Sequence, residues 1–370
     1  MTTIDGTPRR AGQTEWRSLR VRYYADNKDA LILDAVRPLF REFAGKIEQP
    51  YFVRHWRQGP HLRLNFRCSS TEWNNTVLPA ATGSLIEFLR RHPSTAVLDE
   101  VAELRRHQRM ADQEGEIGPL RPWYPDNSIQ CEPYGDRRHI LGSQELTDLL
   151  DASYAESSEL AFAMLDHVRN GPASVLLVAL DLMFAFAHTS VPPIPRGFMS
   201  YRSHAEGFLA RCEDPAAVRS GFDAEYRQQR VALANRLTAV LETLDGAGEV
   251  PFVREWTEIM HRQKALAEPL FTTGKISLNN YRPAGSAGYK FSELHELLHS
   301  TEAYHQETGS SIWFQCHRIA INQLYSHLNR LGIVPMQRFL FCHLVANTVE
   351  DVFGVSALEQ AREYVGGHPG

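Results

Sequence analysis

The sequence predicts an α+β fold, in which an antiparallel or mixed sheet from the first third of the chain packs with a larger helical part. Apolar and polar residues alternate from Trp16 to Tyr24, which indicates a first strand. Two further alternating runs flank Gln58-Gly59-Pro60 and predict a hairpin-like pair of strands. After Ser157, apolar residues recur mostly at helical spacing.

The helical part is expected to be divided by glycine and proline. Asp26 can cap an early helix from Lys28 to Phe43, in which Pro38 implies a kink. Later helices are expected near 157–169, 173–188, 200–211, 215–244, 252–267, 291–307, 311–331 and 336–353. Residues 1–15 are expected to form a loose tail and residues 16–370 a single domain.

Composition narrows the class of protein. The 370 residues are 43% hydrophobic and 22% charged, which is typical of a globular protein. The formal charge of -5 gives no reason to expect nucleic acid or a membrane surface as a partner. The N-terminus lacks an apolar signal segment, and the apolar run 173–187 is broken by Asp181, which favours a core helix over a membrane span. Five cysteines without CxxC spacing indicate reduced thiols and a cytoplasmic protein.

The sequence gives little support for a metal or a cofactor. It has no phosphate-binding loop, dinucleotide fingerprint, serine-hydrolase elbow or zinc-protease motif. His295 and His299 are spaced to share one face of a helix, but no third metal ligand accompanies them. We therefore expect neither a metal nor a cofactor.

A first candidate site lies on the strand 61–67. Side chains on a strand alternate between two faces, so Arg63, Asn65 and Arg67 share the face opposite the apolar residues. Arginine and asparagine side chains in a row can bind a peptide carboxylate or amide. The alternative is an ordinary solvated sheet face.

A second candidate is a polar stripe on the predicted helix 311–331. The stripe recurs at steps of three and four residues and consists of Gln315, Arg318, Asn322, Tyr325 and Asn329. Much of the remaining circumference is apolar, so the helix is expected to be buried and its polar stripe to need a partner or a cavity. An exposed stripe on an amphipathic helix is the alternative.

The third candidate is the segment SYRSHAEGF, residues 200–208. His204 is the natural acid–base group there, because the ordinary pKa of histidine lies near neutrality. A lone histidine at the start of a helix is more often a cap or a packing residue.

Five segments in order resemble one known family. They are LRVRYYADNKDALILDAVRPLF, YFVRHWRQGPHLRLNFR, IQCEPYGDRRHILG with SSELAFAML, SYRSHAEGF, and QLYSHLNRLGI. Together they are similar to the C-terminal, elimination-type domain of lantibiotic dehydratases, which also occurs alone in thiopeptide pathways. The likeness runs from about Trp16 to the end of the chain and implies the same fold.

Members that eliminate glutamate are expected, from the resemblance, to use strand arginines, an arginine in a RYGG-like turn and a histidine before an Asn-Arg pair. Only Arg63 matches this set. The second strand arginine falls on Asn65, the turn arginine on Pro133 and the histidine on Tyr325. Elimination needs a base for the α-proton and cations for the departing carboxylate, so these changes remove much of its machinery.

The chain is therefore most similar to the thiopeptide pyridine synthases of this family. The resemblance implies a formal (4+2) aza-cycloaddition between two dehydroalanines of one leader-bearing precursor peptide, with loss of water and of the leader. The expected catalytic residues are Tyr325 as donor or acid–base group, His204 and Tyr201 as proton relays, and Arg318. The expected substrate-binding residues are Arg63, Asn65, Gln315 and Asn322.

Two other functions stay open on the sequence. One is a stand-alone glutamate-elimination subunit of a split dehydratase, and the other is a non-catalytic module that binds the leader peptide. All three interpretations have a ribosomally made precursor peptide as partner and exclude nucleic acid and membrane. The resemblance is also compatible with a homodimer.

Overall fold

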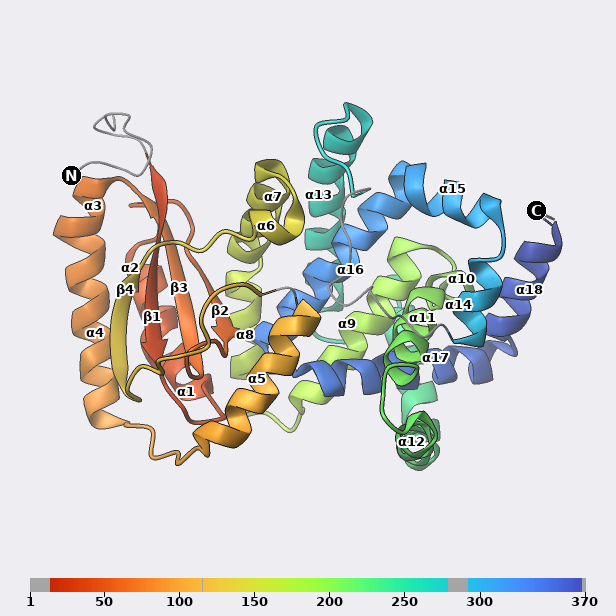
Figure 1. The fold of residues 1–370 in the computed structure, drawn as a ribbon, viewed down its shortest axis with the longest axis horizontal. Coiled ribbons are helices and arrows are strands. Elements are labelled where there is room, and N and C mark those ends of the chain that lie inside the picture. Colours follow the sequence, from red (N-terminus) through yellow and green to blue (C-terminus); the bar gives the residue numbers. More distant parts are fainter. Residues whose placement is uncertain (1–13, 115, 279–291, 368–370) are drawn as a thin grey trace. The chain divides into compact units, whose positions relative to one another are not determined.

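The computed structural model describes residues 14–114, 116–278 and 292–367. These residues divide into two compact units. The first contains the described residues up to 140 together with 150–170, and the second contains 141–149 together with the described residues from 171 onward. Figure 1 shows the sheet in the first unit and an all-helical second unit. The predicted α+β fold class is thereby confirmed.

The first unit is built on one antiparallel sheet with the strand order β2-β3-β1-β4. The strands β1 (Glu15–Arg22), β2 (Tyr51–His55) and β3 (His61–Cys68) correspond to the three predicted from alternation. The strand β4 (Ser128–Glu132) pairs with β1 and was not predicted, because its alternating sequence is only five residues long and follows a proline-rich connection. In the β2–β3 turn, Gln58 and Gly59 have positive φ angles of 60° and 95°.

Helices cover the apolar face of this sheet. The early helical stretch runs through α1 (Asp29–Leu31), a π-helical turn (Ile32–Val36) and α2 (Arg37–Glu42). The π turn ends just before Pro38, whose nitrogen cannot donate a hydrogen bond to the preceding turn. The remaining helical elements up to residue 170 are α3 (Ser70–Glu72), a second π turn (Trp73–Val77), α4 (Leu78–Arg91), α5 (Glu100–Glu114), α6 (Arg138–Leu141), α7 (Gln144–Glu156) and α8 (Ser158–Asn170). Both α6 and α7 include residues of 141–149, which belong to the second unit.

The core of the first unit is aromatic. Phe66 on β3 is fully buried, and its ring lies 5.6 Å from that of Phe40, 6.0 Å from that of Phe43 and 6.0 Å from that of Trp73. Phe40 in turn contacts Phe162 of α8 at 5.8 Å. The alternation of β3 thus places its apolar residues against α2 and α8, as the period of a strand requires.

The second unit is a bundle of helices. It contains α9 (Val175–Ser190), α10 (Ile194–Gly197), α11 (Met199–Leu209), α12 (Pro215–Leu244), α13 (Val253–Thr272), α14 (Glu293–Leu298), α15 (Glu302–Ser310), α16 (Ile312–Arg330), α17 (Pro335–Phe353) and α18 (Ala357–Gly367). The single helix predicted over 291–307 is in fact two, because Thr301 is extended between α14 and α15. Residue 291 lies outside the described residues.

The apolar run of α9 forms the centre of this bundle. Residues 178–187 are all buried. Asp181, which interrupts the run, is only 2% exposed and accepts two hydrogen bonds of 2.5 Å from the Arg236 guanidinium of α12. Such two-fold pairing satisfies a carboxylate that burial would otherwise make costly.

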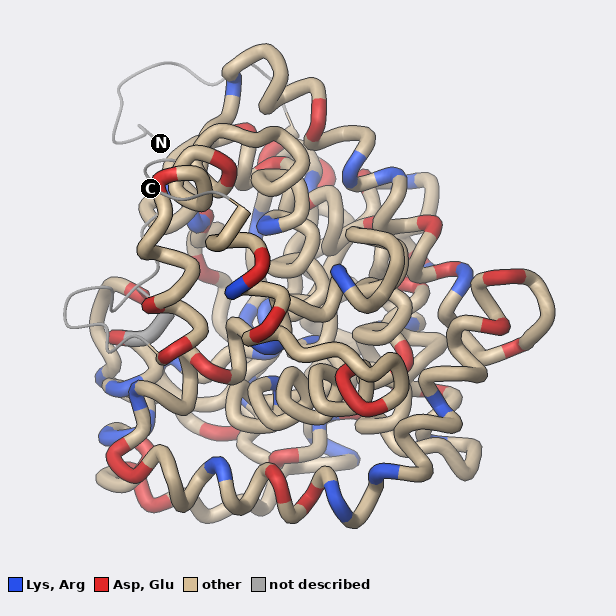
Figure 2. The backbone as a smooth tube through the Cα atoms, turned by 90° about the vertical axis from the view of Figure 1, so that its right-hand side faces the viewer, with Lys and Arg blue, Asp and Glu red and all other residues tan. Residues whose placement is uncertain are grey.

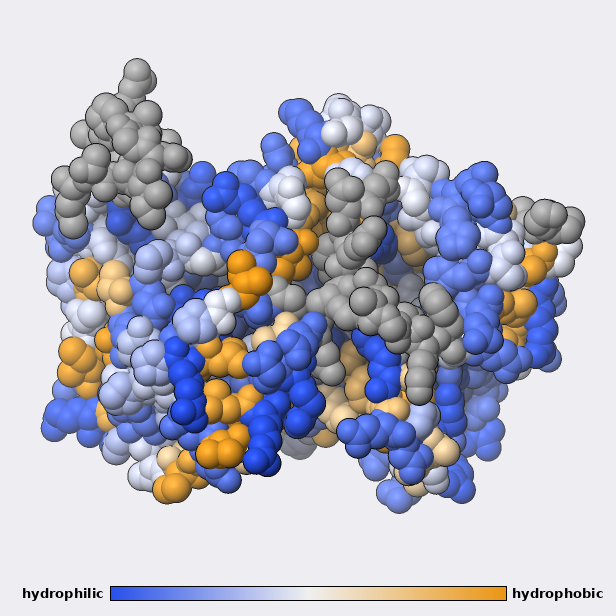
Figure 3. Space-filling view, viewed as in Figure 1, coloured by the Kyte–Doolittle hydropathy of each residue, from blue (hydrophilic) through white to orange (hydrophobic). Residues whose placement is uncertain are grey.

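Charged residues of both signs are spread along the described part of the chain. Figure 2 shows acidic and basic residues interspersed along the backbone, and the face drawn in Figure 3 is mostly hydrophilic with separate apolar patches. Among the described residues no single helix is long and apolar enough to cross a membrane, although α9 and Ile194–Leu209 pass that test as a pair bent by 101°.

The aromatic core predicts a stability effect. Phe66→Ala removes a fully buried ring and should lower the free energy of unfolding by about 3–5 kcal/mol, measured by urea denaturation. Val97→Ala, at a residue that is 96% exposed, is the control and should change it by less than about 0.5 kcal/mol. Equal effects of the two substitutions would contradict this account of the core.

Candidate functional site

The second unit brings two of the predicted catalytic residues together. The Nδ1 atom of His204, on α11, lies 2.6 Å from the hydroxyl oxygen of Tyr325, on α16. The two residues are 121 positions apart in the sequence, so only the packing of α11 against α16 makes them a pair. We call them the His–Tyr pair.

Burial keeps both members of the His–Tyr pair neutral. The pKa of His204 is lowered to about 3, mainly by desolvation and next by the nearby Arg338 guanidinium. Desolvation also raises the pKa of Tyr325 well above its ordinary value. At neutral pH the pair therefore holds one phenol proton and one imidazole proton and carries no net charge.

A buried cysteine completes the arrangement. The Cys342 thiol of α17 lies 3.3 Å from the Tyr325 hydroxyl, and burial raises the pKa of this thiol to about 12. A neutral thiol can donate to the phenol oxygen or accept from it, so the phenol can either donate to His204 or accept from it. When Nδ1 accepts from the phenol, the imidazole Nε2 carries the proton and can donate it. When Nδ1 donates to the phenol, Nε2 can accept a proton. No described residue makes a hydrogen bond to this Nε2.

Arg338 lies against the same phenol. Its guanidinium carbon is 4.7 Å from the centroid of the Tyr325 ring, in a cation–π contact. This cation opposes a positive charge on His204, which is the second cause of the lowered pKa of that histidine. Arg338 thus helps to hold the imidazole in the form that can accept a proton.

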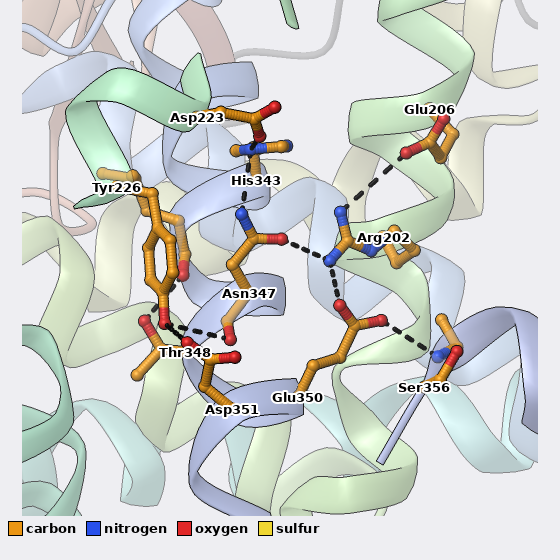
Figure 4. A network of polar contacts seen from close by, with 12 residues as sticks. Arg202, Glu206, Asp223, Tyr226, His343, Asn347, Thr348, Glu350, Asp351 and Ser356 are labelled. Atoms are coloured by element: carbon orange, nitrogen blue, oxygen red, sulfur yellow. Dashed lines mark hydrogen bonds and ion pairs between the residues drawn. The ribbon is translucent and has the colours of Figure 1, made fainter. Parts of the chain in front are cut away.

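A polar network holds α11, the helix that carries His204 (Figure 4). Arg202 donates to the Asn347 side chain at 2.5 Å and forms an ion pair with Glu350, so it ties α11 to α17. One turn later, Glu206 accepts hydrogen bonds of 2.9 and 2.6 Å from the Arg219 guanidinium of α12. These bonds flank His204 on its own helix and fix the direction of that helix.

The same network continues along α17. The Asn347 side chain lies 3.0 Å from the His343 Nε2 atom, which is 2.8 Å from an Asp223 carboxylate oxygen on α12 (Figure 4). Because α17 also carries Cys342, this network sets the positions of both helices that contact Tyr325. A change in it is expected to alter the geometry of the His–Tyr pair without touching either member.

Tyr201 and Gln315 have structural partners instead of an open site. Tyr201 is fully buried and its hydroxyl donates to the Met183 carbonyl at 3.0 Å. Gln315 is 8% exposed, and its side-chain oxygen accepts from the Leu278 backbone N–H at 3.2 Å. Their predicted roles in proton relay and substrate binding stay predictions.

The other predicted residues of α16 differ in exposure. Arg318 is half-buried, whereas Asn322 is exposed. The stripe predicted from the sequence therefore does not lie on one uniformly buried surface. Gln315 and Asn322 are one heptad apart and differ by only about 20° around the helix, so their burial depends on what packs along its length.

The first unit contains the predicted substrate-binding residues Arg63 and Asn65. Asn65 is 4% exposed, so the polar face of β3 is not solvated at this position. The Arg63 Nε donates to the His61 ring at 3.3 Å, while its buried Nη2 has no hydrogen-bond partner in the described part of the chain.

Arg63 lies among other cations. The pKa of Arg63 is lowered to about 9, mainly by desolvation. The positive charge of Arg20 is the next cause of this lowering, and those of Arg57 and Arg137 have smaller effects. Glu116 opposes them, with its carboxylate 3.9 Å from the Arg57 guanidinium and 3.8 Å from that of Arg137. These distances are too long for direct hydrogen bonds. The cluster thus has unused capacity to bind an anion.

Several of these residues were not predicted from the sequence. Cys342 and Arg338 belong to α17, whose sequence has the pattern of an ordinary apolar helix. No local pattern connects these two residues with His204. The sequence did signal the segment 200–208, but it did not indicate that Arg202 would anchor the helix. That role depends on Asn347 and Glu350 in α17, which lie 145 and 148 positions away in the sequence.

The comparisons with known proteins agree on the family. The family model of the C-terminal part of lantibiotic biosynthesis dehydratases matches residues 16–349. The structure of TbtD, a pyridine synthase from thiomuracin biosynthesis, is 34% identical, with a TM-score of 0.76 over 92% of this chain and 99% of that one. The structure of TsrL is 20% identical, covers 95% of this chain and 98% of that one, and has a TM-score of 0.70. No curated protein sequence matches the chain.

The lowered pKa of His204 predicts how stability depends on pH. The folded pKa is about 3 and the unfolded pKa about 6.5, so the unfolded chain takes up this proton first as the pH falls. The protein should therefore lose stability from pH 7 to pH 5. In His204→Gln that loss should be smaller by about 1–2 kcal/mol, as measured by urea unfolding at both pH values. An unchanged loss would show that His204 is not held neutral.

Proposed function

The chain belongs to the family of lantibiotic biosynthesis dehydratase C-terminal domains, and from that premise we propose that it is a thiopeptide pyridine synthase. The observation that carries the proposal is its similarity to the thiomuracin pyridine synthase, which extends over nearly the whole of both chains. The neutral His–Tyr pair supports it, because this pair suits proton transfer to an uncharged amide better than removal of an anionic leaving group.

We propose that the substrate is a dehydrated, azole-bearing precursor peptide that still carries its leader. Two of its dehydroalanines react in a formal (4+2) aza-cycloaddition. One of them contributes its Cβ, Cα and amide nitrogen, and the carbonyl carbon of the residue before it completes the azadiene in the iminol form. Loss of water and then of the leader as a carboxamide gives an aromatic pyridine and a macrocycle. The sequence of steps neither consumes nor produces electrons, so it requires no redox cofactor.

The His–Tyr pair would form the iminol. In this step the amide nitrogen loses a proton while the amide oxygen gains one. The His204 Nε2 atom can accept the first proton when Nδ1 donates to Tyr325. It can then deliver that proton to the amide oxygen, so the His–Tyr pair is neutral again at the end of the step. Arg318, Gln315 and Asn322 remain the proposed contacts that orient the amide, and Tyr201 would act only through the packing of α11.

In the first unit, we propose that Arg63 anchors the peptide by binding one of its carboxylates or carbonyl oxygens. The unused Nη2 atom and the excess of cations around it support this role. Asn65, two residues along the same face of β3, would bind the adjoining backbone amide.

One assay separates this function from its alternatives. The protein is incubated with dehydrated, azole-bearing precursor peptide, and the products are weighed by mass spectrometry. A macrocycle together with a leader carboxamide is the expected result. Loss of glutamate from a glutamylated precursor would indicate an elimination subunit, and binding without any change of mass would indicate a binding module.

The His–Tyr pair predicts a loss of cyclisation. His204→Ala and Tyr325→Phe should each slow macrocycle formation by about 100-fold or more, because positioned acid–base groups contribute factors of this size. His261→Ala, an exposed histidine of α13, and Tyr364→Phe on α18 are the matched controls and should react at the unchanged rate. Full activity in His204→Ala and Tyr325→Phe would remove the pair from the mechanism.

The proposed role of Arg63 as a peptide anchor predicts that a variant of this residue binds the precursor peptide more weakly but still folds. Arg63→Gln should weaken binding of a labelled precursor peptide by about 10- to 100-fold in fluorescence anisotropy, the cost of one or two charge-assisted hydrogen bonds. Because neighbouring arginines and burial disfavour the Arg63 cation, the variant should fold normally.

The control for the anchor comes from the same face of the same strand. Arg67 is paired with Glu48 at 3.3 Å and its side chain is 43% exposed, so Arg67→Gln should change the affinity by less than about 3-fold. Equal weakening in both variants would indicate general electrostatic attraction and exclude a specific anchor at Arg63.

A further inference from the structure

Three polar side chains on one face of α11 each contact a ring from another helix. Ser200, Ser203 and His204 are spaced at i, i+3 and i+4, so they lie side by side. The hydroxyl of Ser200 is 2.6 Å from the His317 Nε2 atom. The hydroxyl of Ser203 is 2.9 Å from the His295 Nε2 atom, and His204 contacts Tyr325 as described above. The His–Tyr pair therefore has neighbours of similar chemistry.

His317 connects two serines. Its Nδ1 atom lies 2.7 Å from the hydroxyl of Ser190, the last residue of α9, and its Nε2 atom contacts Ser200. The imidazole is 5% exposed, whereas both serines are half-buried. The Ser190–His317–Ser200 chain thus joins two partly accessible hydroxyls through one buried ring.

This chain can move a proton without acquiring a charge. Burial lowers the pKa of His317 to about 4, so one ring nitrogen carries a proton and the other accepts one. Each serine hydroxyl can donate and accept. When Ser200 gives up its proton, it can be reprotonated by His317, which is reprotonated in turn by Ser190. Ser190 is half-buried and recovers its proton from solvent water, so the chain ends neutral with the His317 ring in its other tautomer.

The surroundings of His317 favour it over the chain through His295. His317 lies on α16, the helix that carries Tyr325, so both pairs connect the same two helices. The ring of Trp313, which is 45% exposed, lies 6.4 Å from His317, and the ring of Phe314 lies at the same distance. Exposed aromatic surface beside an acid–base chain can hold an apolar or aromatic part of a peptide.

The proposed reaction needs a second set of proton transfers. After water is lost, the ring still carries the leader through a carbon–nitrogen bond. Aromatisation breaks that bond and a ring C–H bond, forms a ring C=C bond and places a proton on the departing amide nitrogen. The proton of the ring C–H bond passes to solvent water, and a positioned donor must supply a proton to the departing amide nitrogen.

We propose that the Ser190–His317–Ser200 chain is this second acid–base group, with the Ser200 hydroxyl donating the proton to the amide nitrogen of the departing leader. The proposal rests on the pyridine synthase function given above. In this proposal two residues on one face of α11 act in different steps. His204 acts in ring formation, and Ser200, one helical turn away, acts in leader release.

The proposal is tested with a variant that should affect leader release but not ring closure. Ser200→Ala should still close the ring but release the leader about 10- to 100-fold more slowly, since it lacks one positioned proton donor. Mass spectrometry of the quenched reaction with dehydrated precursor should then show an accumulating species that has lost one water and kept its leader. Ser200→Thr retains the hydroxyl and should release the leader at nearly the normal rate.

Ser203→Ala is the matched control, because it removes the same group from the same face of α11 and leaves His317 untouched. It should not accumulate the intermediate. Leader release at the normal rate by Ser200→Ala would overturn the proposal, as would equal slowing of ring closure and release. Both results differ from failure of the proposed function itself, in which the unmodified protein would form no macrocycle from the same peptide.

Discussion

The hydrogen bond between His204 and Tyr325 depends on burial more than on any other property of the site. In water an imidazole and a phenol would rarely pair, and the imidazole would be partly protonated at neutral pH. Inside the helical unit, desolvation and the Arg338 cation keep it neutral, and a neighbouring thiol accommodates either direction of the hydrogen bond. An uncharged, reversible proton donor and acceptor is what tautomerisation of an amide requires.

The surrounding helices hold the His–Tyr pair in place. Arg202 and Glu206 lie on either side of His204 along α11, and each forms an ion pair with a different helix. Buried ion pairs contribute little net stability, but they require a specific geometry, which makes them suited to fixing the direction of a helix. The first unit shows the opposite use of charge, because its arginines around Arg63 are only partly compensated and are suited to a ligand.

The fold was largely predictable because it follows from local periodicity. The alternation in β1, β2 and β3 and the helical spacing after residue 157 report directly which faces are buried. The exceptions have physical causes: β4 is short and gains its stability from pairing with β1, and the helix expected over 291–307 is divided at Thr301. A π turn lies just before Pro38, where the sequence predicted a kink, and it accommodates the missing backbone donor.

By itself the sequence determined the family, the residue types at the site and the loss of the cations and histidine that glutamate elimination would use, because these properties belong to individual positions. Only the tertiary structure decided which of the candidates meet. It joined His204 to Tyr325 across 121 positions, added Cys342, turned Asn322 outward and gave Tyr201 and Gln315 structural partners. Contacts between distant segments depend on how whole helices pack, and no local pattern contains that information.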